Sequence, residues 1–190
     1  YIAEGDLDEV RKLSTRFSTM VLGTADVPDP KGTFRNTLEA TAFTQAQNLA
    51  ASEDSLAAAD AFMQFLKDFP TSEHKEFSLY NAAFYYQAAG RAEKANQLYE
   101  EFITKYPDHE FSEKLYFRIA ALYESTLELP KAIEYYTQMH DRFPENENAP
   151  DSLYNAANLQ IGLGRYKTAA EGLETYGTSY PDREDAERVY

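Results

Sequence analysis

Four prolines divide the chain at equal intervals. Neighbouring members of the set are 37 positions apart and each follows an aromatic residue; the pairs are Phe69-Pro70, Tyr106-Pro107, Phe143-Pro144 and Tyr180-Pro181. Proline offers no amide hydrogen and disfavours helical geometry in the residue before it, so each pair predicts the end of a helix. A fixed period of this size indicates stacked repeats. The sequence therefore predicts four repeats, at residues 34–70, 71–107, 108–144 and 145–181.

Alanine recurs at two positions in every repeat, and this predicts two closely packed helices per repeat. The first position holds Ala46, Ala83, Ala120 and Ala157, and the second holds Ala58, Ala95, Ala132 and Ala169. A large apolar residue follows the second alanine by one helical turn, on the same helix face. These residues are Phe62, Tyr99, Tyr136 and Leu173. Because small side chains let helix backbones approach, we expect both alanine positions to be buried.

The turns between the two helices of a repeat carry glycine in two repeats. Gly90 and Gly164 stand where a left-handed residue commonly ends a helix. Leu127 takes the same place in the third repeat. The following Pro130 fits the start of a second helix.

The two flanks do not follow the repeat. Residues 1–33 are predicted to form an amphipathic helix, with apolar residues between Leu7 and Val21, followed by an irregular loop from Gly23 to Gly32. We interpret them as a cap or as the remnant of a divergent repeat. Residues 182–190 are predicted to begin a further, truncated helix.

The charge of the chain limits the partners that it can bind. Acidic residues outnumber basic ones 32 to 18, which gives a formal net charge of −14. This charge repels phosphate backbones and argues against nucleic acid and anionic membranes as partners. There is no cysteine, so disulfides and thiol catalysis are excluded. No apolar run approaches the roughly 20 residues that a membrane-spanning helix needs.

No group of residues has the spacing of a catalytic, cofactor or metal site. His74, His109 and His140 lack a partner at the one-turn spacing of a helical metal pair. We expect them to be surface side chains. Acidic clusters such as Glu100-Glu101 are expected to lie on solvated faces near helix starts, where negative charge is favourable. The sequence thus predicts a protein that is not an enzyme and that has no cofactor and no metal.

The order of these positions resembles the tetratricopeptide repeat. Residues 145–181 match the family pattern best, and residues 71–107 match nearly as well. Repeat 108–144 lacks the glycine, and repeat 34–70 lacks both the glycine and a mid-helix tyrosine. The matching residues of the fourth repeat are Leu153, Ala157, Gly164, Tyr166, Ala169, Leu173 and Pro181. The resemblance implies an all-α fold, a right-handed α-solenoid of antiparallel helix pairs. It also implies a concave groove, lined by the first helix of each repeat, that binds a protein or peptide partner.

The repeat length resembles that of one subgroup of the family. Family repeats usually run about 34 residues. Longer repeats that end in an aromatic-proline step and a polar residue, such as Tyr106-Pro107-Asp108, are similar to those of bacterial envelope lipoproteins and of proteins associated with the Tol-Pal system and with barrel assembly. This similarity implies a periplasmic or outer-membrane-associated protein in a multiprotein envelope complex. The alternative is a cytoplasmic location.

One aromatic position recurs in every first helix and supplies the candidate binding residues. It holds Phe43, Tyr80, Phe117 and Tyr154, at a place that usually faces the groove in the resembled family. Neighbouring candidates on the same helices are Asn81, Phe84, Arg118, Asn155 and Asn158. Rigid aromatic side chains often dominate protein interfaces. The competing interpretation is that the rings only pack between successive first helices.

These observations favour a non-enzymatic interaction scaffold that binds a peptide segment or a partner protein. Some family members hold acidic C-terminal tails with several basic side chains, but here only Arg118 is basic in the relevant column. Such a clamp is therefore not expected. Two alternatives stay open: a regulatory or positioning domain of a larger chain whose catalytic module lies elsewhere, and a purely structural stacking element.

Overall fold

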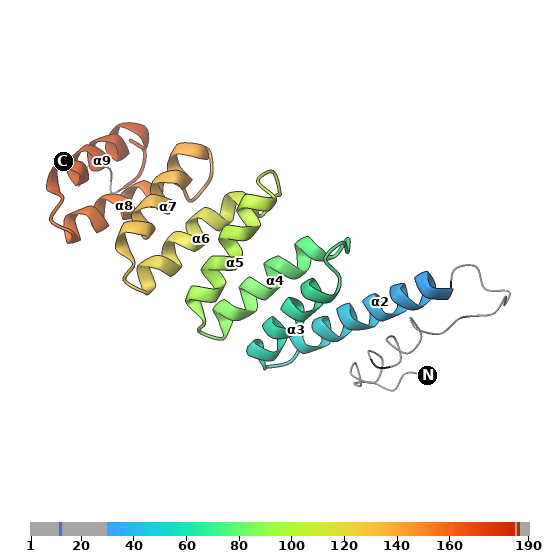
Figure 1. The fold of residues 1–190 in the computed structure, drawn as a ribbon. Helices are drawn as coiled ribbons and strands as arrows, with labels where there is room; N and C mark the ends of the chain where they lie inside the picture. The colour runs from blue at the N-terminus through green and yellow to red at the C-terminus, as the bar shows by residue number, and fades with distance from the viewer. Residues whose placement is uncertain (1–11, 13–29, 185, 187–190) are drawn as a thin grey trace. The chain divides into compact units, whose positions relative to one another are not determined.

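The described part of the chain consists of helices joined by short turns and loops. The computed structural model describes residues 12, 30–184 and 186, and within them there are eight helices and no strand (Figure 1). The helices are α2 (Pro30–Ala50), α3 (Ser55–Asp68), α4 (Lys75–Ala88), α5 (Ala92–Lys105), α6 (Ser112–Ser125), α7 (Leu129–Arg142), α8 (Ala149–Gly162) and α9 (Tyr166–Ser179). The all-α class predicted from the repeats is confirmed.

The chain forms two compact units. Unit 1 comprises residues 1–91 and contains α2, α3 and α4; unit 2 comprises residues 92–190 and contains α5 to α9. In unit 1, α3 packs against both α2 and α4. In unit 2, each helix packs against the next one along the chain. Within each unit, consecutive helices are therefore stacked side by side.

The predicted N-terminal loop ends earlier than expected. Residues 30–32 were expected to be irregular, but they form the first turn of α2. Proline suits this place because its fixed φ angle is preorganised for a helix and the amide that it lacks would have no partner there. The predicted helix between Leu7 and Val21 lies outside the described residues, apart from Lys12. So does most of the predicted helix start at 182–190, and the repeat boundaries themselves stay predictions.

The aromatic-proline pairs end the second helices as predicted. Each of α3, α5, α7 and α9 stops one residue before its aromatic residue. The aromatic residue still donates its amide to the carbonyl four residues back, as from Phe69 to Phe65 at 2.9 Å and from Tyr180 to Tyr176 at 2.9 Å. The proline that follows has no amide with which to continue the ladder.

The recurring alanines lie in the helix contacts. All eight are buried, as the sequence predicts: Ala46, Ala58, Ala83, Ala95, Ala120, Ala132, Ala157 and Ala169. In unit 2, Ala120 of α6 packs in a cluster with Ile133 and Tyr136 of α7 and Ala156 of α8. Small side chains at these places are what bring three helices into one core.

The turn between the two helices of a repeat has one geometry in three places. Gly90 and Gly164 have φ angles of 71° and 72°, and Leu127 has a φ of 61°. In each turn the next residue donates its amide to the carbonyl five residues back, as from Glu128 to Tyr123 at 2.9 Å. This is the Schellman type of helix end. Leu127 therefore keeps a left-handed backbone that suits glycine, with its side chain 80% exposed.

Replacing a buried alanine by leucine should overpack the helix contact. We expect Ala120→Leu to lower the free energy of unfolding by about 1–3 kcal/mol, because the added methyl groups meet Ile133 and Tyr136 in a filled core. Ala170→Leu, at an exposed position of α9, is the control and should change stability little. Thermal and urea unfolding measure both. Equal melting temperatures for the two variants would show that Ala120 is not a tight contact.

Replacing Leu127 by glycine should stabilise the protein. A left-handed backbone costs an L-residue about 1–2 kcal/mol, and glycine removes that strain while adding some entropy to the unfolded chain. We expect Leu127→Gly to raise the free energy of unfolding by about 0.5–1 kcal/mol. The reverse change, Gly164→Leu, should destabilise because Gly164 has the same backbone conformation. A lower melting temperature for Leu127→Gly would contradict the argument.

Candidate protein-interaction surface

Helix α2 contributes an aromatic ring that packs against its neighbours and also reaches the surface. Phe43 of α2 is half-buried. Its ring stacks on the imidazole of His74, with centroids 4.1 Å apart and planes 9° apart. It also lies 5.3 Å from the ring of Phe65 and 5.6 Å from that of Phe77. Phe43 therefore connects the start of α4 to the contact between α2 and α3.

Helix α4 presents the most exposed aromatic face among the predicted residues. Phe84 is 38% exposed, and Phe77, which was not among the residues predicted from the sequence, is 48% exposed. Tyr80 and Asn81 lie between them and are half-buried. Asn81 donates its side-chain amide to the carbonyl of Phe77 at 2.7 Å. The spacing could have revealed Phe77, because Tyr80, Asn81 and Phe84 follow it by three, four and seven residues, and positions at these distances share one helix face.

In unit 2 the same aromatic position rests on the second helix of its own repeat. Phe117 of α6 lies edge-on to Tyr136 of α7, with ring centroids 5.5 Å apart. Tyr154 of α8 lies 5.4 Å from the ring of Tyr176 of α9. Both are half-buried, as are Phe43 and Tyr80. None of the four rings is fully buried, so each both packs and reaches the surface.

The polar candidates of unit 2 lie beside these rings. Arg118 donates to the hydroxyl of Tyr99 at 3.3 Å, and its guanidinium carbon lies 5.8 Å from the centre of that ring. Asn155 is half-buried and Asn158 is exposed on α8. The guanidinium of Arg118 is thus engaged within unit 2, which argues further against a basic clamp for acidic tails.

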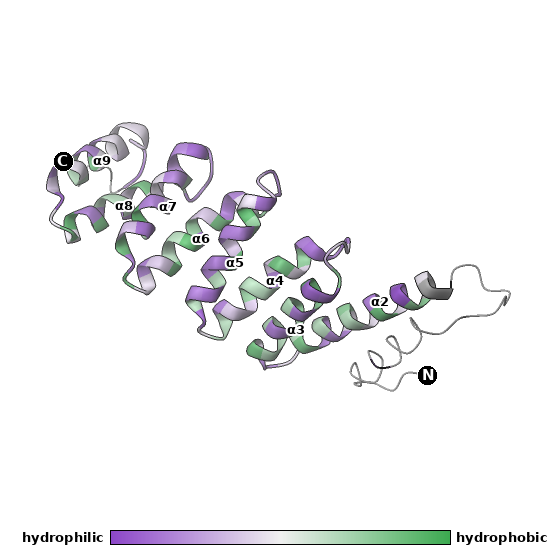
Figure 2. Cartoon of the chain, viewed as in Figure 1, coloured by the Kyte–Doolittle hydropathy of each residue, from purple (hydrophilic) through white to green (hydrophobic). Residues whose placement is uncertain are grey.

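Charge is distributed unevenly between the helices. Helix α4 has no charged residue after Glu76, and α8 has none after Asp151. By contrast, helix α5 contains five charged residues: Glu93, Lys94, Glu100, Glu101 and Lys105. Figure 2 shows the contrast, because α4 is more green than α5, which carries broad purple bands. Beyond their first turns, α4 and α8 therefore present aromatic, aliphatic and carboxamide side chains without ionic groups.

The three histidines are partly exposed and also contact neighbours that the sequence did not predict. All three are half-buried. His74 stacks on Phe43, His109 accepts the amide of Phe111 at its Nδ1 atom at 3.1 Å, and the Nδ1 atom of His140 lies 3.0 Å from the hydroxyl of Tyr180. A histidine has a flat apolar ring with two polar atoms, so it can pack on aromatic neighbours and still bond at its edge. The sequence alone does not reveal which neighbours it meets.

Within residues 12, 30–184 and 186, no three His, Asp or Glu side chains come together in a way that could hold a metal ion. None of the helices described there combines the length and the apolar character that crossing a bilayer requires.

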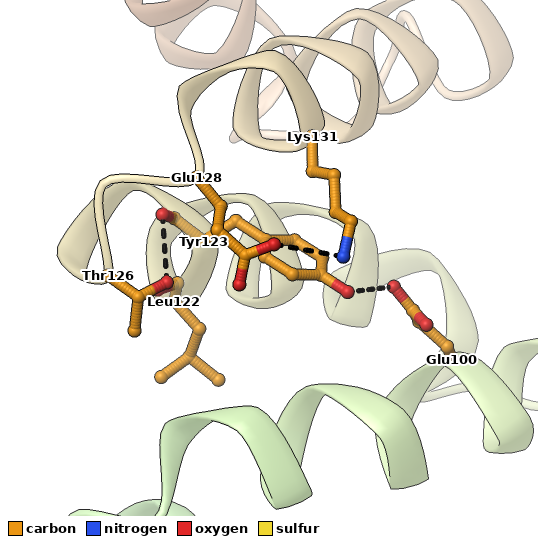
Figure 3. Close-up of polar contacts among 6 residues, drawn as sticks. All are labelled: Glu100, Leu122, Tyr123, Thr126, Glu128 and Lys131. Atoms are coloured by element: carbon orange, nitrogen blue, oxygen red, sulfur yellow. Dashed lines mark hydrogen bonds and ion pairs between the residues drawn. The ribbon is translucent and has the colours of Figure 1, made fainter.

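Tyrosine–carboxylate hydrogen bonds join first helices to the second helices before them. Tyr86 of α4 donates to Asp60 Oδ1 of α3 at 2.5 Å. The equivalent Tyr123 of α6 donates to Glu100 Oε1 of α5 at 2.5 Å (Figure 3). Burial, and then the hydrogen bond to Asp60, raise the pKa of Tyr86 to about 12. Burial and the hydrogen bond to Glu100 likewise raise the pKa of Tyr123.

A lysine completes the cluster around Tyr123. The Nζ atom of Lys131 lies 4.6 Å from the centre of the Tyr123 ring and 2.9 Å from Glu128 Oε2, as Figure 3 shows. The hydrogen bond to Glu128 is the largest cause of a raised pKa for Lys131. The cluster connects α5, α6 and α7 through one phenol and its ring, and it stabilises the scaffold on which the surface residues stand.

A sequence profile described as tetratricopeptide repeat matches residues 77–109 and 151–183. No curated protein sequence matches the chain. Among solved structures, a tetratricopeptide repeat protein from Parabacteroides merdae is similar, with a TM-score of 0.60 and 16% identity over 80% of this chain. This chain spans 57% of that one.

Two further structures are similar over nearly the whole chain. One is MamA of Desulfovibrio magneticus RS-1, from position 41 to the end, with a TM-score of 0.54 and 17% identity over 96% of this chain and 99% of that one. The other is BtubC (BKLC) from P. vanneervenii, with a TM-score of 0.53 and 14% identity over 94% of this chain and 71% of that one. Residues 77–109 and 151–183 therefore match the tetratricopeptide repeat in sequence, and the similar structures show that the described residues have the all-α fold of such repeats.

The raised pKa of Tyr86 predicts a loss of stability in strong alkali. The pKa is about 12 in the folded protein and near 10 in an unfolded chain, so this contribution is complete below pH 10 and is lost as the pH rises to 12. We expect Tyr86→Phe to unfold about 0.5–1.5 kcal/mol more easily at neutral pH, because the hydrogen bond to Asp60 is gone. The gap between the two proteins should narrow from pH 10 to 12. A constant gap would contradict the assignment.

Proposed function

We propose that this protein is a non-catalytic scaffold that binds an uncharged, apolar segment of a partner protein on its first helices. The observation that carries the proposal is the face of α4, where Phe77 and Phe84 are exposed on either side of Tyr80 and Asn81. Stacked repeats typically present such side chains in rows for binding. An exposed aromatic side chain on a rigid helix can bury a large area at a low cost in conformational entropy.

The chemistry of the surface selects the partner. The faces of α4 and α8 lack charge beyond their first turns, while the chain as a whole has a net charge of −14. An acidic segment would meet no ionic partner on these faces and would be repelled by the rest of the surface. A basic segment would be drawn to the acidic surfaces elsewhere. Apolar side chains of an uncharged segment can instead pack on Phe77 and Phe84 without leaving a charge unpaired.

The carboxamides suit recognition of a peptide backbone. Asn158 is exposed on α8, one turn from Tyr154 and three residues from Asn155. A carboxamide can both donate to and accept from a main chain without requiring a particular side chain. On each helix we therefore assign orientation to its own asparagines and most of the binding energy to its own aromatic rings, whose burial removes more apolar surface from water.

We further propose that the scaffold works within a bacterial cell-envelope assembly, in the periplasm or at the outer membrane. The support is the repeat length of 37 residues with its aromatic-proline step. The competing proposal is a cytoplasmic scaffold. Fractionation of cells that express the complete gene product distinguishes the two.

A selection from a random peptide library tests the binding face. We expect wild-type protein to enrich apolar peptides without acidic clusters, and Phe84→Ser to bind the best of them at least tenfold more weakly, since truncating an interface aromatic often costs more than about 1 kcal/mol. Phe111→Ser is the matched control, because Phe111 is also 38% exposed but lies outside the first-helix face. Fluorescence anisotropy with the selected peptide gives the affinities. Enrichment of acidic peptides, or equal losses in both variants, would contradict the proposal.

A further inference from the structure

Unit 2 has an edge that is unusually rich in exposed apolar side chains. The turn between α6 and α7 and the turn between α8 and α9 lie at the same edge, because successive helices alternate in direction (Figure 1). Leu127 is 80% exposed, Tyr166 69%, Ile161 41% and Leu163 36%. We call these four residues, with Glu128, Arg165 and Lys167, the two-turn edge. It holds half of the large apolar side chains that are exposed in the described part of the chain.

Leu127 is unfavourable at this edge for two independent reasons. Its side chain is largely in water, and its backbone has the left-handed φ that Gly90 and Gly164 supply elsewhere. A glycine would fit the same turn, since a Cβ atom built at Gly90 or Gly164 meets no atom within 4 Å and only the backbone conformation is at issue. A strained residue that the fold does not need points to a role outside the fold.

The two turns carry charges of opposite sign. Glu124 and Glu128 flank Leu127, with Lys131 paired to Glu128 at 2.9 Å. Between Asp151 and Glu171, the only charged residues are Arg165 and Lys167, and both are positive. In a chain with a net charge of −14 this is a local reversal of sign. The two-turn edge therefore has an acidic and a basic end, each with exposed apolar side chains.

We propose that the two-turn edge binds the same edge of a second copy of this chain about a two-fold axis. A two-fold axis pairs a surface with itself, so the α6–α7 turn of each copy faces the α8–α9 turn of the other. Leu127 then packs against Leu163 and Tyr166 of the second copy, and Glu128 faces Arg165. The charge pattern supports a second copy because the edge is complementary to itself. The proposal does not depend on the binding face of α4.

The small size of the two-turn edge determines how strongly we expect two copies to associate. Stable interfaces usually bury about 800 Å² on each partner, and smaller ones are weak and transient. Seven residues on two turns are fewer than the roughly 20–30 of a standard interface. We therefore expect a dimer that forms and dissociates with concentration, not an obligate one. Its association should depend on salt, because exposed charges are screened.

Leu127→Gly provides a test in which stability and association change in opposite directions. We expect the average mass of the wild-type protein in sedimentation equilibrium to rise toward that of a dimer with concentration. Leu127→Gly should associate at least tenfold more weakly while its melting temperature rises. Leu163→Ser should also weaken association. Leu56→Ser is the matched control and should not, because Leu56 is 37% exposed, close to the 36% of Leu163, but belongs to α3 of unit 1.

A charge exchange tests the two-fold arrangement itself. Glu128→Arg alone and Arg165→Glu alone should each weaken self-association, because each places like charges opposite one another twice. An equal mixture of the two variants should associate again, since every contact then joins opposite charges. Circular dichroism checks that both variants are folded.

Each outcome decides the proposal. A wild-type protein that stays monomeric at all concentrations, whether or not the edge binds a different partner, would overturn it. So would unchanged association of Leu127→Gly, or a mixture of the charge variants that fails to associate while the wild-type protein dimerises.

Discussion

The close approach of neighbouring helices at the alanine positions is the contact on which the rest of the structure depends. A buried helix contact leaves no room for longer side chains where two backbones meet. Gly172 of α9 shows the limit, because a Cβ atom at that residue would lie only 3.2 Å from the Cβ atom of Ala157. Ala120 likewise meets both α7 and α8 through the cluster with Ile133 and Ala156. Once the helices lie this close, the large side chains one turn away must interlock or move outward.

The tyrosines complete the packing that the alanines begin. Their rings fill the space between helices, and their hydroxyls reach carboxylates at the boundary with water, as Tyr86 does at Asp60 and Tyr136 does at Glu124. A buried phenol without such a partner would lose the hydrogen bonds that it makes in water. This arrangement explains how an acidic chain can be rich in tyrosine at its helix contacts. It also uses several carboxylates inside the scaffold, while α4 and α8 carry no charge beyond their first turns.

The described residues present two surfaces with different chemistry. The face of α4 in unit 1 is aromatic and uncharged, which suits an apolar segment of a partner. The two-turn edge of unit 2 combines apolar side chains with charges of both signs, which suits self-association. Both surfaces stand on helices or short capped turns, so the backbone that carries their side chains is fixed before any partner arrives. Preorganisation of this kind lowers the entropy that binding must overcome.

The sequence by itself determined the features that repeat and the features that are local. The helix ends at Phe69-Pro70 and its equivalents follow from proline alone, and burial of Ala83 and its equivalents follows from the period. The tertiary structure decided exposure and pairing, because these depend on neighbours from other helices. It distinguishes the exposed Phe84 from the half-buried Tyr80. It also joins Tyr86 to Asp60 across 26 residues and keeps Leu127 left-handed. A side chain's period assigns it to a helix face, but only the packed neighbours decide whether that face meets water.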